Sequence, residues 1–378
     1  MLNLIFNQEK LIKLKHLQSL RGILALWIFI CHSFAFALRG QEFGLVSKIV
    51  YFLPSGEQTV NVFIILSGFV ITMVLTEKNE NLKQFYIRRF CRIYPVYIIS
   101  LLLAFILFPL MISDVLKVLP WGDSSSYYKD LIAKTETTWS KSWLIFWLQF
   151  LNIQGLVPHT VIPIASGAIL PVAWSISLEC QFYAVAPLLI ANSKNKHVLR
   201  WLLILLIGLV SVVLTQFNQW GFSKAFLLVS FGYFMFGIAS YDVYRYLRKN
   251  SLSLTMFQVF SILVLILLLF GKVWAVLIWV FFMLFSFLRQ GKIEDIIRKF
   301  VESRLLVFLG DISYSIYLWH ILVLWITPMI LFKLSIKSPD MHALINIFLG
   351  VPLVIGISYI SYTFIEKPFI RYGKKISI

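Results

Sequence analysis

Long apolar runs dominate the sequence, and each is about as long as a helix that crosses the hydrocarbon core of a bilayer. About 20 apolar residues in a helix span roughly 30 Å of hydrocarbon. Of the 378 residues, 60% are hydrophobic and only 13% are charged, against about 25% charged in an ordinary soluble domain. The sequence therefore predicts an all-α integral membrane protein, and it excludes a soluble enzyme, a disordered chain and a secreted disulfide scaffold.

The runs predict about ten membrane-spanning helices within a single transmembrane domain over residues 1–378. They lie near residues 20–38, 60–76, 93–113, 172–191, 198–216, 224–241, 252–271, 273–288, 305–330 and 343–365. An eleventh segment, 142–152, is short and rich in tryptophan. Residues 113–171 form the longest stretch between spans. We expect an ordered outer loop there, which is either a lid or acceptor site or a plain connector.

The distribution of positive charge sets the expected orientation. If the N-terminus is cytoplasmic and 142–152 does not cross, 24 of the 34 Lys and Arg residues fall in cytoplasmic segments, as the positive-inside rule requires. A crossing at 142–152 inverts every later segment and removes this excess. We therefore expect both termini in the cytoplasm and a re-entrant or interfacial segment at 142–152. The net charge of +17 then reflects topology, and no nucleic-acid partner is expected.

Ionisable residues inside the predicted spans are functional candidates, because charge in hydrocarbon is costly. Arg21 and His32 are eleven residues apart, so they share one helix face, roughly 16 Å apart along the axis. Ser175, Glu179 and Tyr183 are spaced by four and form a polar stripe. A carboxylate there needs a cation or a hydrogen-bond donor. Pairing of Glu179 with His32 or with an arginine is one reading, and a purely structural polar contact is the other.

A basic cluster opens the third run, just before Pro95. It consists of Arg88, Arg89 and Arg92. One reading is an anchor that follows the positive-inside rule, and composition alone favours it. The other is a phosphate clamp at the cytoplasmic face, because guanidinium groups bind phosphate in bidentate fashion. Pro95 predicts that a helix begins or bends at this point.

The ninth run carries further polar side chains. Asp311 is expected in its inner half, while Ser313, Tyr317 and His320 share a face. Tyr317 and His320 are candidate cavity-lining residues, although aromatic residues here serve packing equally well. The cysteines are isolated, and the sequence has no zinc spacing, Walker loop, dinucleotide fingerprint or nucleophile elbow. We therefore expect no metal and no ATP-driven step.

Six segments, in order, resemble acyltransferase family 3, the membrane O-acyltransferases of envelope glycans and other glycosides. They are LQSLRGILALWIFICHSF, VFIILSGFVI, YIRRFCRIYPVY, WSISLECQFYAVAPLL, LGDISYSIYLWH and FIEKPFIRYGKK. Where many members have two adjacent acids in the fourth segment, this chain has Glu179 followed by Cys180, so a role for a second acid is not expected. The chain ends soon after the last run, which predicts a member without the fused periplasmic hydrolase-like domain.

The resemblance implies a multi-pass enzyme of the bacterial cytoplasmic (inner) membrane. It implies transfer of an acyl group, usually acetyl, from cytoplasmic acyl-CoA to a hydroxyl of an envelope glycan, such as lipopolysaccharide, or of a lipid-linked saccharide. Arg88, Arg89 and Arg92 would bind the phosphates of acyl-CoA. His32 would act as general base or as a transient acyl carrier.

Two further residues acquire expected roles from the same resemblance. Glu179 would orient or charge-stabilise His32, and Arg21 would hold the donor or pair with an acid. The competing class is a proton-coupled transporter or flippase, in which intramembrane His and carboxyl groups relay protons. Inverted repeats and paired interrupted helices are typical of that class, and neither stands out in the sequence. A membrane scaffold is a third reading, but it leaves the intramembrane charges unexplained.

Overall fold

A computed structural model describes residues 14–38, 55–77, 80–110, 126–190, 197–249, 274–284, 292–334 and 338–377. Within these ranges the protein is entirely helical, without strands. Its helices are α2 (Lys15–Leu38), α4 (Gly56–Glu77), α5 (Leu82–Leu110), α6 (Ser126–Trp139), α7 (Ser142–Phe150), η2 (Gln154–Leu156), η3 (Ala165–Gly167), α8 (Ala173–Ile190), α9 (His197–Gln216), α10 (Leu227–Lys249), α12 (Trp274–Leu284), α13 (Lys292–Val301), α14 (Arg304–Asp311), α15 (Ser313–Lys333), α16 (Pro339–Ser361), η6 (Tyr362–Glu366) and α17 (Lys367–Ile376).

The predicted all-α class is confirmed for the residues that the structure describes. Among the described residues, six helices are long and apolar enough to cross a membrane, or seven if one bent pair counts as a single span. The apolar helices over Arg200–Gln216 and Trp274–Met283 are shorter. The span expected at 252–271 lies outside the described residues. Ten crossings and two cytoplasmic termini therefore remain predictions.

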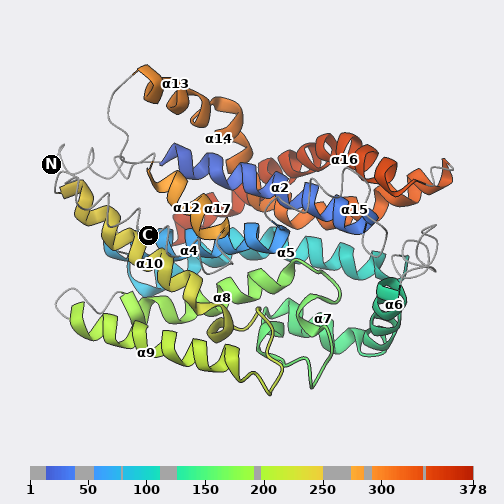
Figure 1. Cartoon of the computed structure of the whole chain (residues 1–378), viewed down its shortest axis with the longest axis horizontal. Coiled ribbons are helices and arrows are strands. Elements are labelled where there is room, and N and C mark those ends of the chain that lie inside the picture. Colours follow the sequence, from blue (N-terminus) through green and yellow to red (C-terminus); the bar gives the residue numbers. More distant parts are fainter. Residues whose placement is uncertain are drawn as a thin grey trace.

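The helices form an elongated bundle in which α2, α9 and α16 lie along the long axis and α6 stands across one end (Figure 1). The outer face of α9 carries leucines that are more than half exposed, including Leu202, Leu205 and Leu209. A soluble protein rarely exposes so continuous an apolar stripe. Such a stripe is suited to contact with the acyl chains of a bilayer.

Glycine pairs let helices cross at backbone contact. A Cβ atom on Gly68 of α4 would lie 2.6 Å from the Phe234 carbonyl oxygen of α10. A Cβ atom on Gly22 of α2 would lie 2.6 Å from the Gly310 amide nitrogen of α14. Any larger residue would push these helices apart, so small residues draw α2, α4, α10 and α14 together.

Two sequence predictions about helix ends need correction. The run 305–330 is not one helix, because Ile312 leaves the helical conformation (φ −92°, ψ 3°). The helical segments before and after it meet at 59°. Of the two readings of Pro95, a helix start is excluded, since α5 starts at Leu82 and continues through that residue, while a bend there stays a prediction. Neighbouring helices in a membrane bundle can satisfy the backbone groups that proline leaves unpaired.

The segment predicted as re-entrant or interfacial contains the nine-residue helix α7. Trp143 and Trp147 on this helix are more than half exposed. Tryptophan is enriched at membrane interfaces, where its ring is partly in water and partly in lipid. The position of α7 relative to the bilayer remains a prediction.

Candidate functional site

The described part of the bundle contains a partly open cavity of about 120 Å³ between α2, α4, α5, α8, α10 and α15. Much of its wall is apolar, including Phe63, Ile64 and Phe234. Its polar wall combines three arginines, one glutamate and several hydroxyl groups. These residues are Arg21, Arg89, Arg92, Glu179, Ser67, Ser175, Tyr183, Ser313, Tyr314 and Tyr317. Helices far apart in the sequence thus bring most of the candidate residues together.

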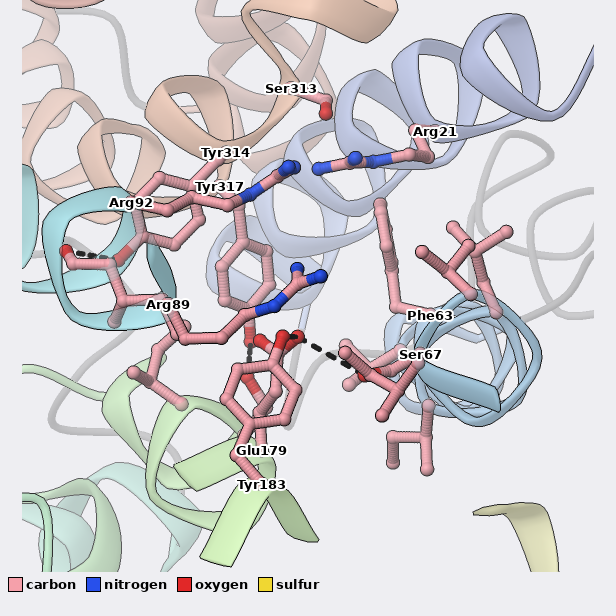
Figure 2. A pocket seen from close by; sticks show the side chains of 18 of the residues that line it. Arg21, Phe63, Ser67, Arg89, Arg92, Glu179, Tyr183, Ser313, Tyr314 and Tyr317 are labelled. Carbon is pink, nitrogen blue, oxygen red and sulfur yellow. Dashed lines mark hydrogen bonds between the residues drawn. The ribbon is translucent and has the colours of Figure 1, made fainter. Parts of the chain in front are cut away.

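Three guanidinium groups converge on this cavity. Figure 2 shows Arg21 and Arg92 pointing toward each other, while Arg89 points toward Glu179. The Arg89 guanidinium carbon also lies 5.5 Å from the ring centre of Tyr183, within the range of a cation–π contact. The Nε atom of Arg21 is buried without a hydrogen-bond partner among the described residues.

Two carboxylates balance the three arginines only in part. Among the described residues, no carboxylate oxygen forms an ion pair with Arg21, Arg89 or Arg92. Glu179 and Glu366 act on Arg21 at longer range. Three positive and two negative groups leave an excess of positive charge, so the cavity is suited to an anion with several oxygen acceptors.

Glu179 is held by hydroxyl groups. Its Oε1 atom accepts hydrogen bonds from Ser67 Oγ at 3.2 Å and from the Tyr183 hydroxyl. Ser175, one turn before Glu179, has its Oγ 2.7 Å from the Tyr317 hydroxyl. The stripe of Ser175, Glu179 and Tyr183 therefore faces the cavity, but Glu179 forms its hydrogen bonds with α4 and its own helix.

His32 is not among the residues that line the cavity. Its Nδ1 atom is 2.9 Å from Nε2 of His320. The two rings are nearly parallel, with an interplanar angle of 7° and centres 5.2 Å apart. The sequence left open a pairing of His32 with Glu179. The structure instead pairs His32 with His320, which the sequence analysis treated only as a candidate lining residue.

Arg88 also lies outside the cavity. It donates from Nε to Ser377 Oγ at 2.8 Å and pairs through NH1 with Glu80. The predicted cluster of three arginines is thus divided: Arg89 and Arg92 line the cavity, and Arg88 ties the start of α5 to the end of α17. Arg88 does not face the cavity with Arg89, because successive residues of a helix point about 100° apart.

Asp311 and Ser313 separate at the break between α14 and α15. Asp311 is exposed and accepts a hydrogen bond from Gln18 Nε2 at 2.8 Å, whereas Ser313 lines the cavity. The change of direction at Ile312 takes Asp311 away from the polar interior. This carboxylate serves the contact between α14 and α2.

Sequence reasoning assigned no role to Glu366. This carboxylate is only 2% exposed and accepts a hydrogen bond from Ser315 Oγ at 2.8 Å. It ends the π-helical turn η6, and such turns often occur at functional sites. The segment FIEKPFIRYGKK, which contains the residue, entered the sequence analysis only through the family resemblance. The π-helical turn that accompanies its inward position is not visible in the sequence pattern.

Comparison with known proteins decides the family. The family model for the acyltransferase domain Acyl_transf_3 matches residues 15–363. The chain belongs to acyltransferase family 3. The resemblance seen in six sequence segments is thereby confirmed, and family 3 membership covers every helix that contributes to the cavity.

Two curated relatives illustrate the similarity. "Acyltransferase MdmB" of Streptomyces mycarofaciens is 27% identical over 183 residues, which is 47% of this chain and 40% of that protein. "Putative O-acetyltransferase SACOL0978" of Staphylococcus aureus (strain COL) is 25% identical over 371 residues, which is 85% of this chain and 54% of that protein. The chain thus spans about half the length of these family 3 relatives. No solved structure matches it.

Proposed function

We propose that this protein is a membrane O-acyltransferase that transfers an acyl group, acetyl in the simplest case, from acyl-CoA to a hydroxyl of an envelope glycan or lipid-linked saccharide. The observation that carries the proposal is the convergence of Arg21, Arg89 and Arg92 on one internal cavity in a member of acyltransferase family 3. An acyl-CoA donor carries several phosphates on a long arm. Guanidinium groups bind phosphate strongly and with defined geometry.

The arginine side of the cavity receives the donor in this proposal. Arg89 and Arg92 hold phosphate oxygens, and Arg21 holds the phosphate or pantetheine end. Glu179, fixed by Ser67 and Tyr183, offsets part of the repulsion among these guanidinium groups. We place this side of the protein toward the cytoplasm of a bacterial inner membrane, as the positive-inside rule favours.

His32 acts as the general base. A sugar hydroxyl is a weak nucleophile, and imidazole has a reference pKa of about 6.5, near the operating pH. His32 takes the hydroxyl proton while the hydroxyl oxygen bonds to the thioester carbonyl carbon. The carbon–sulfur bond then breaks, the thiolate of CoA leaves with the bonding electrons, and the proton passes from His32 to sulfur. The products are an ester and free CoA.

The first test follows the acyl group. Membranes containing the protein are incubated with radiolabelled acetyl-CoA, and label is measured in glycan. We expect label in glycan with the native protein. With His32→Ala we expect the rate of label transfer to fall on the order of 100-fold or more, because general bases contribute about 10²–10⁴-fold to reaction rates. The exposed His159 provides the control variant His159→Ala.

Two results would overturn the proposal. Full activity of a folded His32→Ala protein removes His32 from the chemistry. Movement of a solute or glycan lipid without any label transfer indicates a transporter or flippase instead. Mass spectrometry of envelope glycans from a deletion strain then identifies the acceptor through the missing ester.

A further inference from the structure

We infer that His320 is a positioning residue that fixes the tautomer of His32, so that Nδ1 of His32 carries the proton and Nε2 carries the lone pair. The tautomer follows from hydrogen-bond geometry together with the burial of His320. Its catalytic consequence rests on the proposed function, in which His32 Nε2 is the atom that accepts the hydroxyl proton.

The first step concerns Nδ1 of His320. This atom lies 2.6 Å from the backbone carbonyl oxygen of Tyr317. A carbonyl oxygen can only accept a hydrogen bond, so Nδ1 of His320 must be the donor. The contact joins residues one helical turn apart, so the His320 ring is oriented by the backbone of its own helix, α15.

The second step concerns the charge of His320. The residue is completely buried (0% exposed), and none of its hydrogen bonds goes to a carboxylate among the described residues. A buried charge without such a partner is costly, so the ring is neutral. A neutral imidazole with its proton on Nδ1 has a lone pair on Nε2.

The third step transfers this assignment to His32. His320 Nε2 accepts, so the 2.9 Å contact requires a proton on His32 Nδ1. The two ring centres are 5.2 Å apart, which equals the 2.9 Å nitrogen–nitrogen contact plus the distance from each ring centre to its own nitrogen. The two ring planes differ by only 7°. The rings therefore meet edge to edge in nearly one plane, which is the geometry of a well-aligned hydrogen bond.

With its proton on Nδ1, the neutral form of His32 has its lone pair on Nε2. This atom lies at the start of α4, where a Cβ atom on Gly56 would be 3.5 Å away. When Nε2 takes a proton, the ring becomes positive and its existing bond to His320 becomes charge-assisted, which strengthens it. His320 thus orients the base before the reaction and stabilises the imidazolium during it, as the third group of a catalytic triad does.

The decisive measurement is the nitrogen NMR spectrum of ¹⁵N-histidine-labelled protein in detergent or lipid. The chain has six histidines, and the resonances of His32 are assigned by their loss in His32→Gln. We expect a protonated Nδ1 and an unprotonated Nε2 in the native protein. In His320→Ala we expect His32 to be a mixture of its two tautomers. In the control variant His159→Ala we expect the same tautomer ratio at His32 as in the native protein.

Kinetics supply the second measurement. His320→Ala should lower kcat on the order of 100-fold, as expected for a displaced reacting group, and leave KM for acetyl-CoA within twofold. His320→Gln can present its side-chain oxygen near the place of Nε2, so it should recover activity relative to His320→Ala. Thermal unfolding of each variant shows whether it is folded.

The outcomes separate this inference from the proposed function. A proton on Nε2 of His32 in the native protein overturns the inference, as does an unchanged tautomer in folded His320→Ala. An Nδ1 proton that depends on His320, together with absence of any acyl transfer, supports the positioning role and rejects the proposed reaction. If His320→Ala does not fold, His320→Gln decides: loss of the Nδ1 tautomer in that folded variant contradicts the acceptor role of residue 320.

Discussion

At the scale of single residues, the placement of arginines determines what the cavity can bind. Arg89 and Arg92 line it, while Arg88 pairs with Glu80 and Ser377. The sequence identified a basic cluster but could not divide it, because Arg92 lies between the other two on a helical wheel and neighbouring segments decide which side faces inward. Glu366 escaped notice for a related reason: its inward position accompanies a π-helical turn.

The division among the arginines predicts unequal effects on donor binding. Arg92→Gln should raise KM for acetyl-CoA roughly 10- to 100-fold, because a hydrogen bond to a charged group is worth about 1.5–3 kcal/mol. Arg88→Gln, which removes a charge from the same helix outside the cavity, should change KM much less. Steady-state kinetics on both variants tests this, and equal effects would contradict donor binding in the cavity.

At the scale of helices, the sequence predicted most elements but not how they cross. Apolar runs are local and visible, so α2, α4, α5, α8 and α10 coincide with expected spans. The break at Ile312 lies next to the close contact between Gly310 and Gln18 of α2, which no local pattern reveals. At Pro95 the sequence left a helix start and a bend open, and only the start is excluded, since α5 continues through that residue.

The crossing of α4 and α10 predicts opposite effects for two glycines on one helix. Gly237 touches the backbone of α4 at Ile65 and Phe69, whereas a Cβ atom on Gly232 would meet nothing within 4 Å. Gly237→Ala should cost about 1–3 kcal/mol through overpacking, and Gly232→Ala should be neutral or stabilising by up to about 1 kcal/mol. Thermal unfolding in detergent measures both; equal melting temperatures would refute the close crossing.

The start of α4 predicts a graded effect at Gly56. A Cβ atom there is at ordinary contact distance from His32 Nε2 and Cys31 Cβ, so Gly56→Ala should retain activity. Gly56→Val adds two methyl groups toward the imidazole and should lower kcat/KM for the acceptor at least about tenfold while KM for acetyl-CoA is unchanged. Acyl transfer assays with each substrate varied separately distinguish the two. If the valine variant uses the acceptor as well as the native protein does, the reaction does not take place at Nε2 of His32.

At the scale of the whole molecule, composition alone predicted the membrane class, because 13% charged residues are too few to cover the surface of a soluble protein of 378 residues. Topology is harder to derive. The rule of positive charge assigns sides only when the number of crossings is right, and the helices over Arg200–Gln216 and Trp274–Met283 are short for a span. The tryptophan-rich helix α7 shows the same difficulty, since length and hydropathy alone do not separate a short span from an interfacial helix.

The expected orientation is testable with reporters at the C-terminus. Green fluorescent protein fused after Ile378 should fluoresce, because a cytoplasmic end lets it fold, and alkaline phosphatase at the same place should be inactive. A reporter placed within residues 113–125 should give the reverse pattern. An active phosphatase at the C-terminus would mean that an odd number of crossings separates it from a cytoplasmic N-terminus.

Tyr317 contacts both the cavity wall and the histidine pair. Its hydroxyl meets Ser175 at the cavity wall, and its backbone carbonyl holds the His320 ring. Because both groups sit on one turn of α15, any shift of that turn that widens the cavity also tilts the imidazole pair. Under the proposed function, changes at this wall that favour longer acyl chains will therefore alter turnover together with selectivity, and the two properties must be engineered jointly.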